Sequence, residues 1–216
     1  MSIDIIERPY YYADMVKSIL PVTPKAERTR QHILAEGLLM ATEKSLNEVT
    51  IGELAKAAKL SKSGLFAHFQ SKENLQIAII NYASQIFTER VIKSVNENLS
   101  PIEKLQSLAN NWLDWYEGSA KSCIFMTGTM EFDGKPGQVR NALHNQIHRW
   151  IKFLEIKTQQ AANEQELMQN TDPKQFVFEL YSLFLGSQKY LWIEKENENR
   201  KFFNRGLRHL IQQYSN

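Results

Sequence analysis

The chain has 216 residues, of which 43% are hydrophobic and 23% charged, a composition that predicts a folded globular protein and excludes a disordered one. Its formal net charge is only +2, so any surface for nucleic acid must be local rather than a property of the whole chain. The single cysteine, Cys123, cannot form an intramolecular disulfide, and we find neither a secretory signal nor an apolar run long enough for a membrane helix. We therefore expect a cytoplasmic protein with no membrane partner.

Helix-forming signals recur along the chain, whereas strand signals are scarce. Thr50, Ser100 and Asp172 each precede a periodic apolar segment and have Glu or Gln three residues later, which is the pattern of a capped helix. The sequence therefore predicts an all-α fold of about nine helices. The helices expected from periodicity cover about residues 24–43, 51–58, 62–68, 72–97, 101–117, 122–131, 136–165, 173–195 and 198–214.

Three regions are expected along the chain. Residues 1–22 form an N-terminal extension with apolar side chains at helical spacing, and its only basic residues are Arg8 and Lys17. Because arms that enter the minor groove usually carry several Arg or Lys, we expect this extension to pack on protein or fray rather than to contact DNA. Residues 23–75 are predicted to form a small helix-turn-helix domain that continues into the next helix, and residues 76–216 a larger helical domain.

The strongest functional pattern lies in LSKSGLFAHFQSKENL, residues 60–75. Two short predicted helices flank the three-residue turn Ala58–Leu60, which is the spacing of a helix-turn-helix. Leu65 and Phe69 lie on one face of the second helix, and small or polar side chains lie on the opposite face. Small residues allow a helix to come close to base edges in a major groove.

Two helix starts in this segment are candidate anion sites. Ser61 and Ser71 are predicted caps, and Lys72 follows the second of them, where the free amides of a helix start favour a phosphate. Arg28, on the preceding helix, is a further candidate for the same face. The segment is only weakly basic, so these residues alone leave open both a DNA-binding hairpin and a hairpin that binds protein.

The segment TIGELAKAAKLSKSGLFAHFQSKENL, residues 50–75, resembles the DNA-binding region of the TetR family of bacterial transcriptional regulators. A second stretch, CIFMTGTMEFDGKPGQVRNAL, is similar to one subgroup of that family. The resemblance implies a homodimer with an N-terminal domain that binds an operator in double-stranded DNA. It also implies a larger C-terminal domain that dimerises and binds a small-molecule effector.

The resemblance also implies roles for individual residues of the hairpin. The implied phosphate contacts are Thr50, Phe66, His68 and Lys72, and the implied base or groove contacts are Lys62, Ser63, Gly64 and Ala67. Two positions depart from the commonest family pattern: Ser63 and Gly64 stand where Gly followed by Thr or Ser is usual, and Phe66 stands where Tyr is common. Phe66 lacks the hydroxyl that a tyrosine would offer to a phosphate.

Aromatic and sulfur-containing side chains concentrate in the predicted C-terminal domain. Such residues at helical spacing most often form a hydrophobic core, but a helical bundle that contains many of them can also enclose an apolar pocket. The candidate effector-binding residues are Trp112, Trp115, Tyr116, Phe125, Met126, Met130, His144, Tyr181, Phe184 and Gln188. We expect a small apolar or amphipathic effector that releases a repressor from its operator.

The helix expected at 173–195 is apolar over most of its circumference, so it must be covered on two sides. One apolar seam contains Phe178, Tyr181 and Leu185, while Gly186 and Ser187 allow close approach of another helix. Together with the last helix, this segment is predicted to form a four-helix interface between two subunits.

Catalytic, metal and cofactor chemistry have little support in the sequence. His144 and His148 are four residues apart, but no third metal ligand and no HExxH glutamate accompany them. Glu131 and Asp133 are more consistent with solvated loop residues than with a catalytic carboxylate pair, and Cys123 with a buried structural residue. We therefore expect no cofactor and no enzyme. The alternative function is a protein-interaction or small-molecule-binding module that has lost specific DNA binding.

Overall fold

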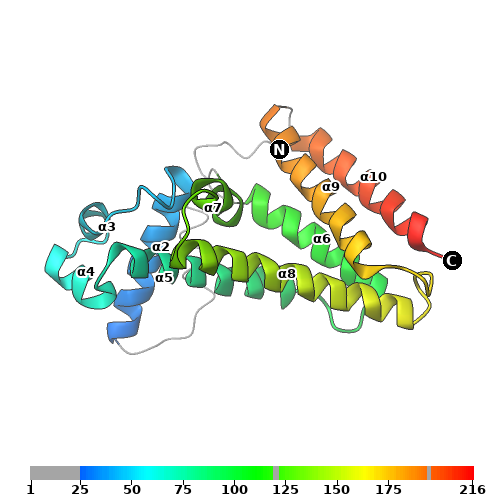
Figure 1. Cartoon of the computed structure of the whole chain (residues 1–216), viewed down its shortest axis with the longest axis horizontal. Helices are drawn as coiled ribbons and strands as arrows, with labels where there is room; N and C mark the ends of the chain where they lie inside the picture. The colour runs from blue at the N-terminus through cyan, green and yellow to red at the C-terminus, as the bar shows by residue number, and fades with distance from the viewer. Residues whose placement is uncertain (1–24, 119–121, 194–195) are drawn as a thin grey trace. The chain divides into compact units, whose positions relative to one another are not determined.

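The structure, a computed structural model, describes residues 25–118, 122–193 and 196–216 (Figure 1). All regular secondary structure within these residues is helical, which confirms the all-α prediction and its nine α-helices. The helices are α2 (Lys25–Glu43), α3 (Ile51–Ala57), α4 (Lys62–Phe69), α5 (Lys72–Phe87), α6 (Pro101–Glu117), α7 (Ile124–Phe132), α8 (Gln138–Asn163), α9 (Pro173–Ile193) and α10 (Glu196–Tyr214). The predicted N-terminal extension, residues 1–22, lies outside the described residues.

The main departure from the predicted helices is at the end of the fourth one. The helix expected at 72–97 is α5, followed by a π-helical segment, η1 (Thr88–Ile92). The Thr88 hydroxyl donates a hydrogen bond to the Ser84 carbonyl at 2.9 Å, a local bond of the kind that bends helices. The amide of Val95 then donates to the Ile92 carbonyl in a turn, and the polar segment that follows has no apolar stripe to hold it in a helix.

The chain divides into two compact units. The first contains the described residues as far as Arg90 together with residues 115–147, and the second contains residues 91–114 and 148–216. Helices α6 and α8 each contribute residues to both units. The predicted domain boundary after residue 75 stays a prediction.

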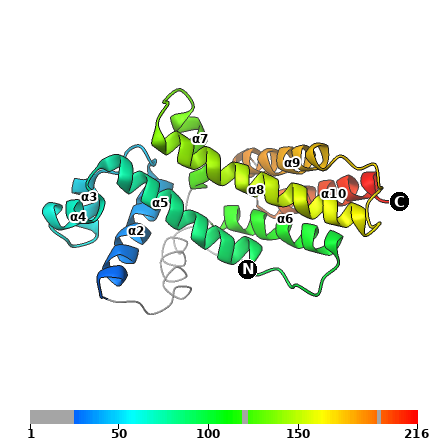
Figure 2. The same ribbon diagram turned by 60° about the horizontal axis from the view of Figure 1, so that its bottom comes forward.

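The first unit is built on a close crossing of α2 and α5, which Figure 2 shows. Gly37 lies at this crossing, because a Cβ atom there would be 2.7 Å from Cδ1 of Ile79. Leu38, Leu54 and Leu65 are fully buried, so α2, α3 and α4 share one apolar core. This core fixes the position of the helix-turn-helix.

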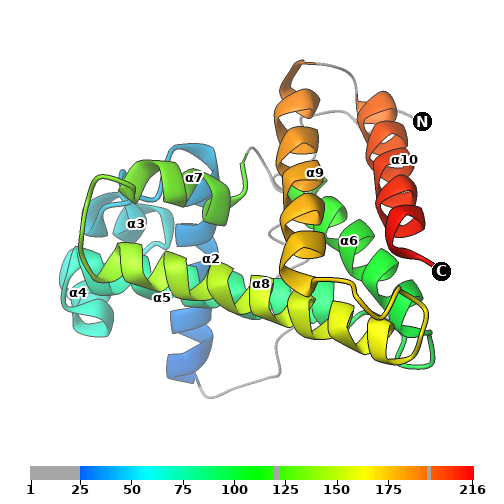
Figure 3. The same ribbon diagram turned by 45° about the vertical axis from the view of Figure 1, so that its right-hand side comes forward.

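The second unit contains the pair α9 and α10, which lie side by side in Figure 3. The two helices approach closely at Gly206 of α10, where a Cβ atom would be 2.6 Å from Cδ1 of Leu183. Phe176, Phe184 and Phe203 are fully buried in this unit. Among the described residues, no helix is both long and apolar enough to cross a membrane.

Candidate DNA-binding surface and effector residues

The turn between α3 and α4 has the geometry that a helix-turn-helix needs. The Leu60 amide donates to the Ala55 carbonyl at 2.9 Å, and the Lys59 amide donates to the Lys56 carbonyl at 3.3 Å. These bonds close the end of α3 in the manner of a Schellman motif, with Lys59 in the left-handed conformation at φ 54°. The predicted turn at 58–60 is therefore present.

All three predicted caps in this region are formed. The hydroxyl of Thr50 accepts a hydrogen bond from the Glu53 amide at 3.2 Å. That of Ser61 accepts from the Gly64 amide at 3.0 Å, and that of Ser71 from the Asn74 amide at 3.0 Å. The first amides of α4 have no partner within the helix, so the start of the helix keeps donors for an anion.

The structure places the two faces of α4 as the sequence predicts. Leu65 and Phe69 are buried, with 0% and 4% of their surfaces exposed, whereas the neighbouring Phe66 is 52% exposed. None of the other candidate DNA contacts is buried. Arg28, Ser61, Lys62, Ser63, Ala67, His68 and Lys72 are exposed, and Thr50 and Gly64 are half-buried.

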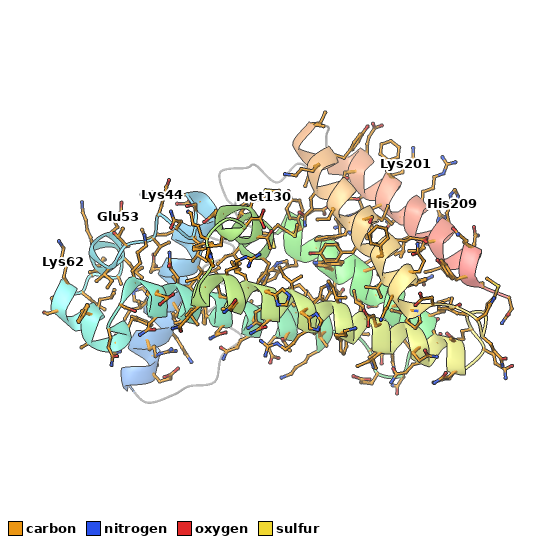
Figure 4. The ribbon with its side chains drawn as sticks, in the orientation of Figure 1. Lys44, Glu53, Lys62, Met130, Lys201 and His209 are labelled. Carbon is orange, nitrogen blue, oxygen red and sulfur yellow. The ribbon has the colours of Figure 1, made fainter. Side chains whose placement is uncertain are left out.

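Two of the lysines are oriented by contacts within the first unit. Lys62 lies against α3, because a Cβ atom on Gly52 would be 3.2 Å from Cε of Lys62. Figure 4 shows Lys62 along the same edge as Glu53. The Lys72 ammonium donates to the backbone carbonyl of Asn47, in the loop between α2 and α3. Each side chain is thus held near the surface that α4 presents.

The candidate effector residues of the second unit form one aromatic cluster. The Trp112 ring stacks on Phe184 with centroids 3.6 Å apart, and the Tyr181 ring lies 5.2 Å from it. Trp150, which is not among the candidate residues, contacts Trp112 edge-on at 5.4 Å. Gln188 is buried in the same unit.

The candidate residues of the first unit form a second cluster around Phe87 of α5. The rings of Trp115 and Phe125 lie 5.5 and 6.0 Å from that of Phe87, edge to face. Cys123 is buried, and this burial raises the pKa of its thiol, in line with a structural cysteine. Phe87 was not among the candidate residues, because its position in a long apolar helix does not indicate that it contacts Trp115 and Phe125.

The remaining candidates of the first unit are less enclosed. Tyr116 and Met126 are half-buried, and burial raises the pKa of the Tyr116 hydroxyl. Met130 is 64% exposed on α7, and His144 is exposed on α8, so the structure does not enclose these two side chains.

One open hollow of about 600 Å³ lies in the second unit, and its lining is mostly polar, including Ser100, Lys104, Lys157 and Glu164. The described residues also contain no group of three His, Cys, Asp or Glu side chains that could hold a metal ion.

Two family models match the chain, and together they cover more than half of it. Residues 33–79 match "Bacterial regulatory proteins, tetR family", and residues 101–207 match "Tetracyclin repressor-like, C-terminal domain". The transcriptional repressor NemR of Escherichia coli is 24% identical over 183 residues, 79% of this chain and 87% of NemR. The transcriptional regulator AcuR of Cereibacter sphaeroides is 23% identical over 154 residues, 69% of this chain and 70% of AcuR.

Solved structures share the fold. A TetR-family transcriptional regulator from Streptomyces coelicolor superposes with a TM-score of 0.76 at 15% identity, covering 88% of this chain and 97% of that one. AibR, solved in complex with isovaleryl coenzyme A and operator DNA, gives a TM-score of 0.62 at 24% identity over 83% of this chain and 96% of its own. With both segments matched by family models, this chain belongs to the TetR family of bacterial transcriptional regulators.

Proposed function

We propose that this DNA-binding regulator is a cytoplasmic, non-enzymatic repressor that binds a near-palindromic operator as a homodimer and is released by a small apolar or amphipathic effector. The observation that carries the proposal is that α4 has one buried and one exposed face. Leu65 and Phe69 anchor the buried face, and the first turn presents mostly small side chains at the surface. The printed description of NemR as a repressor and of AibR as bound to operator DNA supports the same function.

In this proposal α4 enters the major groove, and the hairpin contacts phosphates on either side of it. Lys62, Ser63 and Ala67 face the bases, while Thr50 and Lys72 approach the backbone. A dimer places two such helices about 34–36 Å apart, one turn of the duplex. The N-terminal domain in this proposal is residues 23–75, and the remainder dimerises and binds the effector.

A footprint on the DNA that flanks the protein's own reading frame tests the proposal. We expect protection of two inverted half-sites one helical turn apart, weakened by a cell extract that contains the effector. The logarithm of the binding constant should fall linearly with the logarithm of the salt concentration, because lysines displace counterions from phosphates. Association that ignores both sequence and salt would instead favour the alternative, a protein-interaction module that has lost specific DNA binding.

The exposed face of α9 is the proposed dimer interface. Phe178 and Ile193 are 66% and 67% exposed, and half-buried Leu185 lies between them on the same face, together with the charged side chains Lys174 and Lys189. On α10, by contrast, Lys201 and His209 project away from α9 (Figure 4). The predicted four-helix interface also includes α10, where Phe202 is 46% exposed.

Gly186 offers a sharp test of this interface. A Cβ atom there would meet nothing within 4 Å in the protomer, so Gly186→Arg should leave the protomer folded and obstruct only a neighbouring subunit. We expect sedimentation to change from dimer to monomer at micromolar concentration, while circular dichroism shows a helical content equal to that of the parent. Gly134→Arg is the matched control, since that position is equally open but lies in the loop after α7. A Gly186→Arg protein that stays dimeric would exclude this face.

The two aromatic clusters are the proposed effector contacts. Trp112, Tyr181 and Phe184 carry one cluster, and Trp115 and Phe125 the other. Because the rings of each cluster are in direct contact, the effector in this proposal binds a conformer in which one cluster opens. A ligand that binds that conformer more tightly than the DNA-bound one lowers operator affinity by the ratio of its two affinities.

A further inference from the structure

Glu131 makes an unusual long-range contact from the last turn of α7. Its carboxylate accepts a hydrogen bond from the Asn47 amide at 2.9 Å and a longer one from the Leu46 amide at 3.4 Å. These amides belong to the loop between α2 and α3, 84 and 85 residues away in the chain. Sequence analysis favours a solvated carboxylate here, whereas Glu131 is half-buried and engaged with backbone donors.

The same loop is held from other directions by two side chains of α5. The Lys72 ammonium donates to the Asn47 carbonyl, and the Gln76 side-chain amide donates to the Leu46 carbonyl at 2.9 Å. Gln76 is buried, so its hydrogen bond is shielded from water and orders the loop. Residues 46 and 47 therefore connect α7 with the start of α5.

This loop leads directly into residues proposed to contact DNA. Thr50, three residues after Asn47, caps α3, and Lys72 is oriented by the Asn47 carbonyl. A lysine ammonium has three donors, so the bond to Asn47 leaves two for a phosphate. The position of the loop therefore sets the position of a candidate phosphate contact.

We propose that Glu131 is a positioning residue for operator binding, acting through the α2–α3 loop on Lys72. Glu131 itself touches no DNA. Because it lies on α7, whose first turn contains Phe125 of the Phe87 cluster, the contact also connects a candidate effector residue with the DNA-binding surface. This inference rests on the proposed DNA-binding function.

A substitution that removes the charge of Glu131 distinguishes this positioning role from a purely electrostatic one by the direction in which operator affinity changes. If Glu131 were only a negative charge near DNA, Glu131→Gln would strengthen binding. If it positions the loop, Glu131→Gln leaves one loop amide facing an NH₂ group, releases Lys72 and weakens binding. The two interpretations therefore predict opposite changes in affinity.

The experiment measures binding of full-length variants to the DNA duplex protected in the footprint, across a salt series. For Glu131→Gln we expect an affinity about 10-fold lower than that of the parent, because Lys72 no longer reaches its phosphate. The slope of log K against log salt should also become shallower, by about one per protomer. In a Lys72→Met background the same substitution should change affinity less than about 2-fold, because the two residues act through one contact. Asp133→Asn is the matched control, since it removes the same charge from an exposed residue two positions away.

A second measurement needs no DNA. We expect amide hydrogen exchange in the peptide containing Leu46 and Asn47 to be about 10-fold faster in Glu131→Gln than in the parent or in Asp133→Asn. Unchanged exchange, or an operator affinity that is unchanged or higher in Glu131→Gln, would overturn the inference. A parent protein that binds no operator would refute the proposed function instead, and the exchange measurement would still decide whether Glu131 holds the loop.

Discussion

Replacing Lys62 and Lys72 together by alanine is expected to weaken operator binding by about 100-fold at physiological salt. Both side chains are exposed, at the start of α4 and of α5, and each lies beside helix amides that attract an anion. Losing two cations at the interface should also reduce the slope of log K against log salt by about one to two per protomer. Fluorescence anisotropy with the footprinted duplex at several salt concentrations measures both quantities.

Lys174→Ala provides the control for this double substitution. Lys174 is also exposed, but it lies in the first turn of α9, outside the helix-turn-helix. It should leave the affinity and the slope unchanged, and all variants should unfold at the denaturant concentration of the parent, because exposed lysines contribute little to stability. An unaltered salt slope in the double variant would remove Lys62 and Lys72 from the interface.

The local features of the fold were predictable because their chemistry is local. A cap needs only a hydroxyl at one position and an amide three residues later, so Thr50, Ser61 and Ser71 could be assigned from sequence and are confirmed. The buried face of α4 followed equally from periodicity, with Leu65 and Phe69 inside. The extent of α5 did not, because apolar periodicity does not mark the π-helical segment η1 that follows Phe87.

The less predictable features depend on how separate helices meet. Met130 and His144 were grouped with the pocket by composition, yet both are exposed, because composition does not tell which face of a helix meets a neighbouring helix. The contact between Glu131 and Asn47 joins residues 84 positions apart, and no local pattern marks it. Phe87 joins a cluster with Trp115 for the same reason.

Two adjacent residues of α4 should separate folding from DNA binding. Leu65 is fully buried, so Leu65→Ala is expected to cost about 2–5 kcal/mol of unfolding free energy by leaving a cavity between α4 and the rest of the first unit. Phe66 is about half exposed, so Phe66→Ala should change stability by no more than about 0.5 kcal/mol. Urea denaturation monitored by circular dichroism gives both values.

Substitutions at Leu65 and Phe66 should affect operator affinity differently from stability. Phe66→Ala is expected to lower affinity about 10-fold while the protein stays folded, because the ring contributes packing area next to a phosphate. Phe66→Tyr should instead raise affinity, since it adds a hydroxyl donor at an exposed position without filling any buried space. Leu65→Ala should lose binding only to the extent that the first unit unfolds, so its affinity recovers under conditions that restore the fold. Full affinity in Phe66→Ala, or a loss of stability there as large as in Leu65→Ala, would contradict the assignment of these two faces.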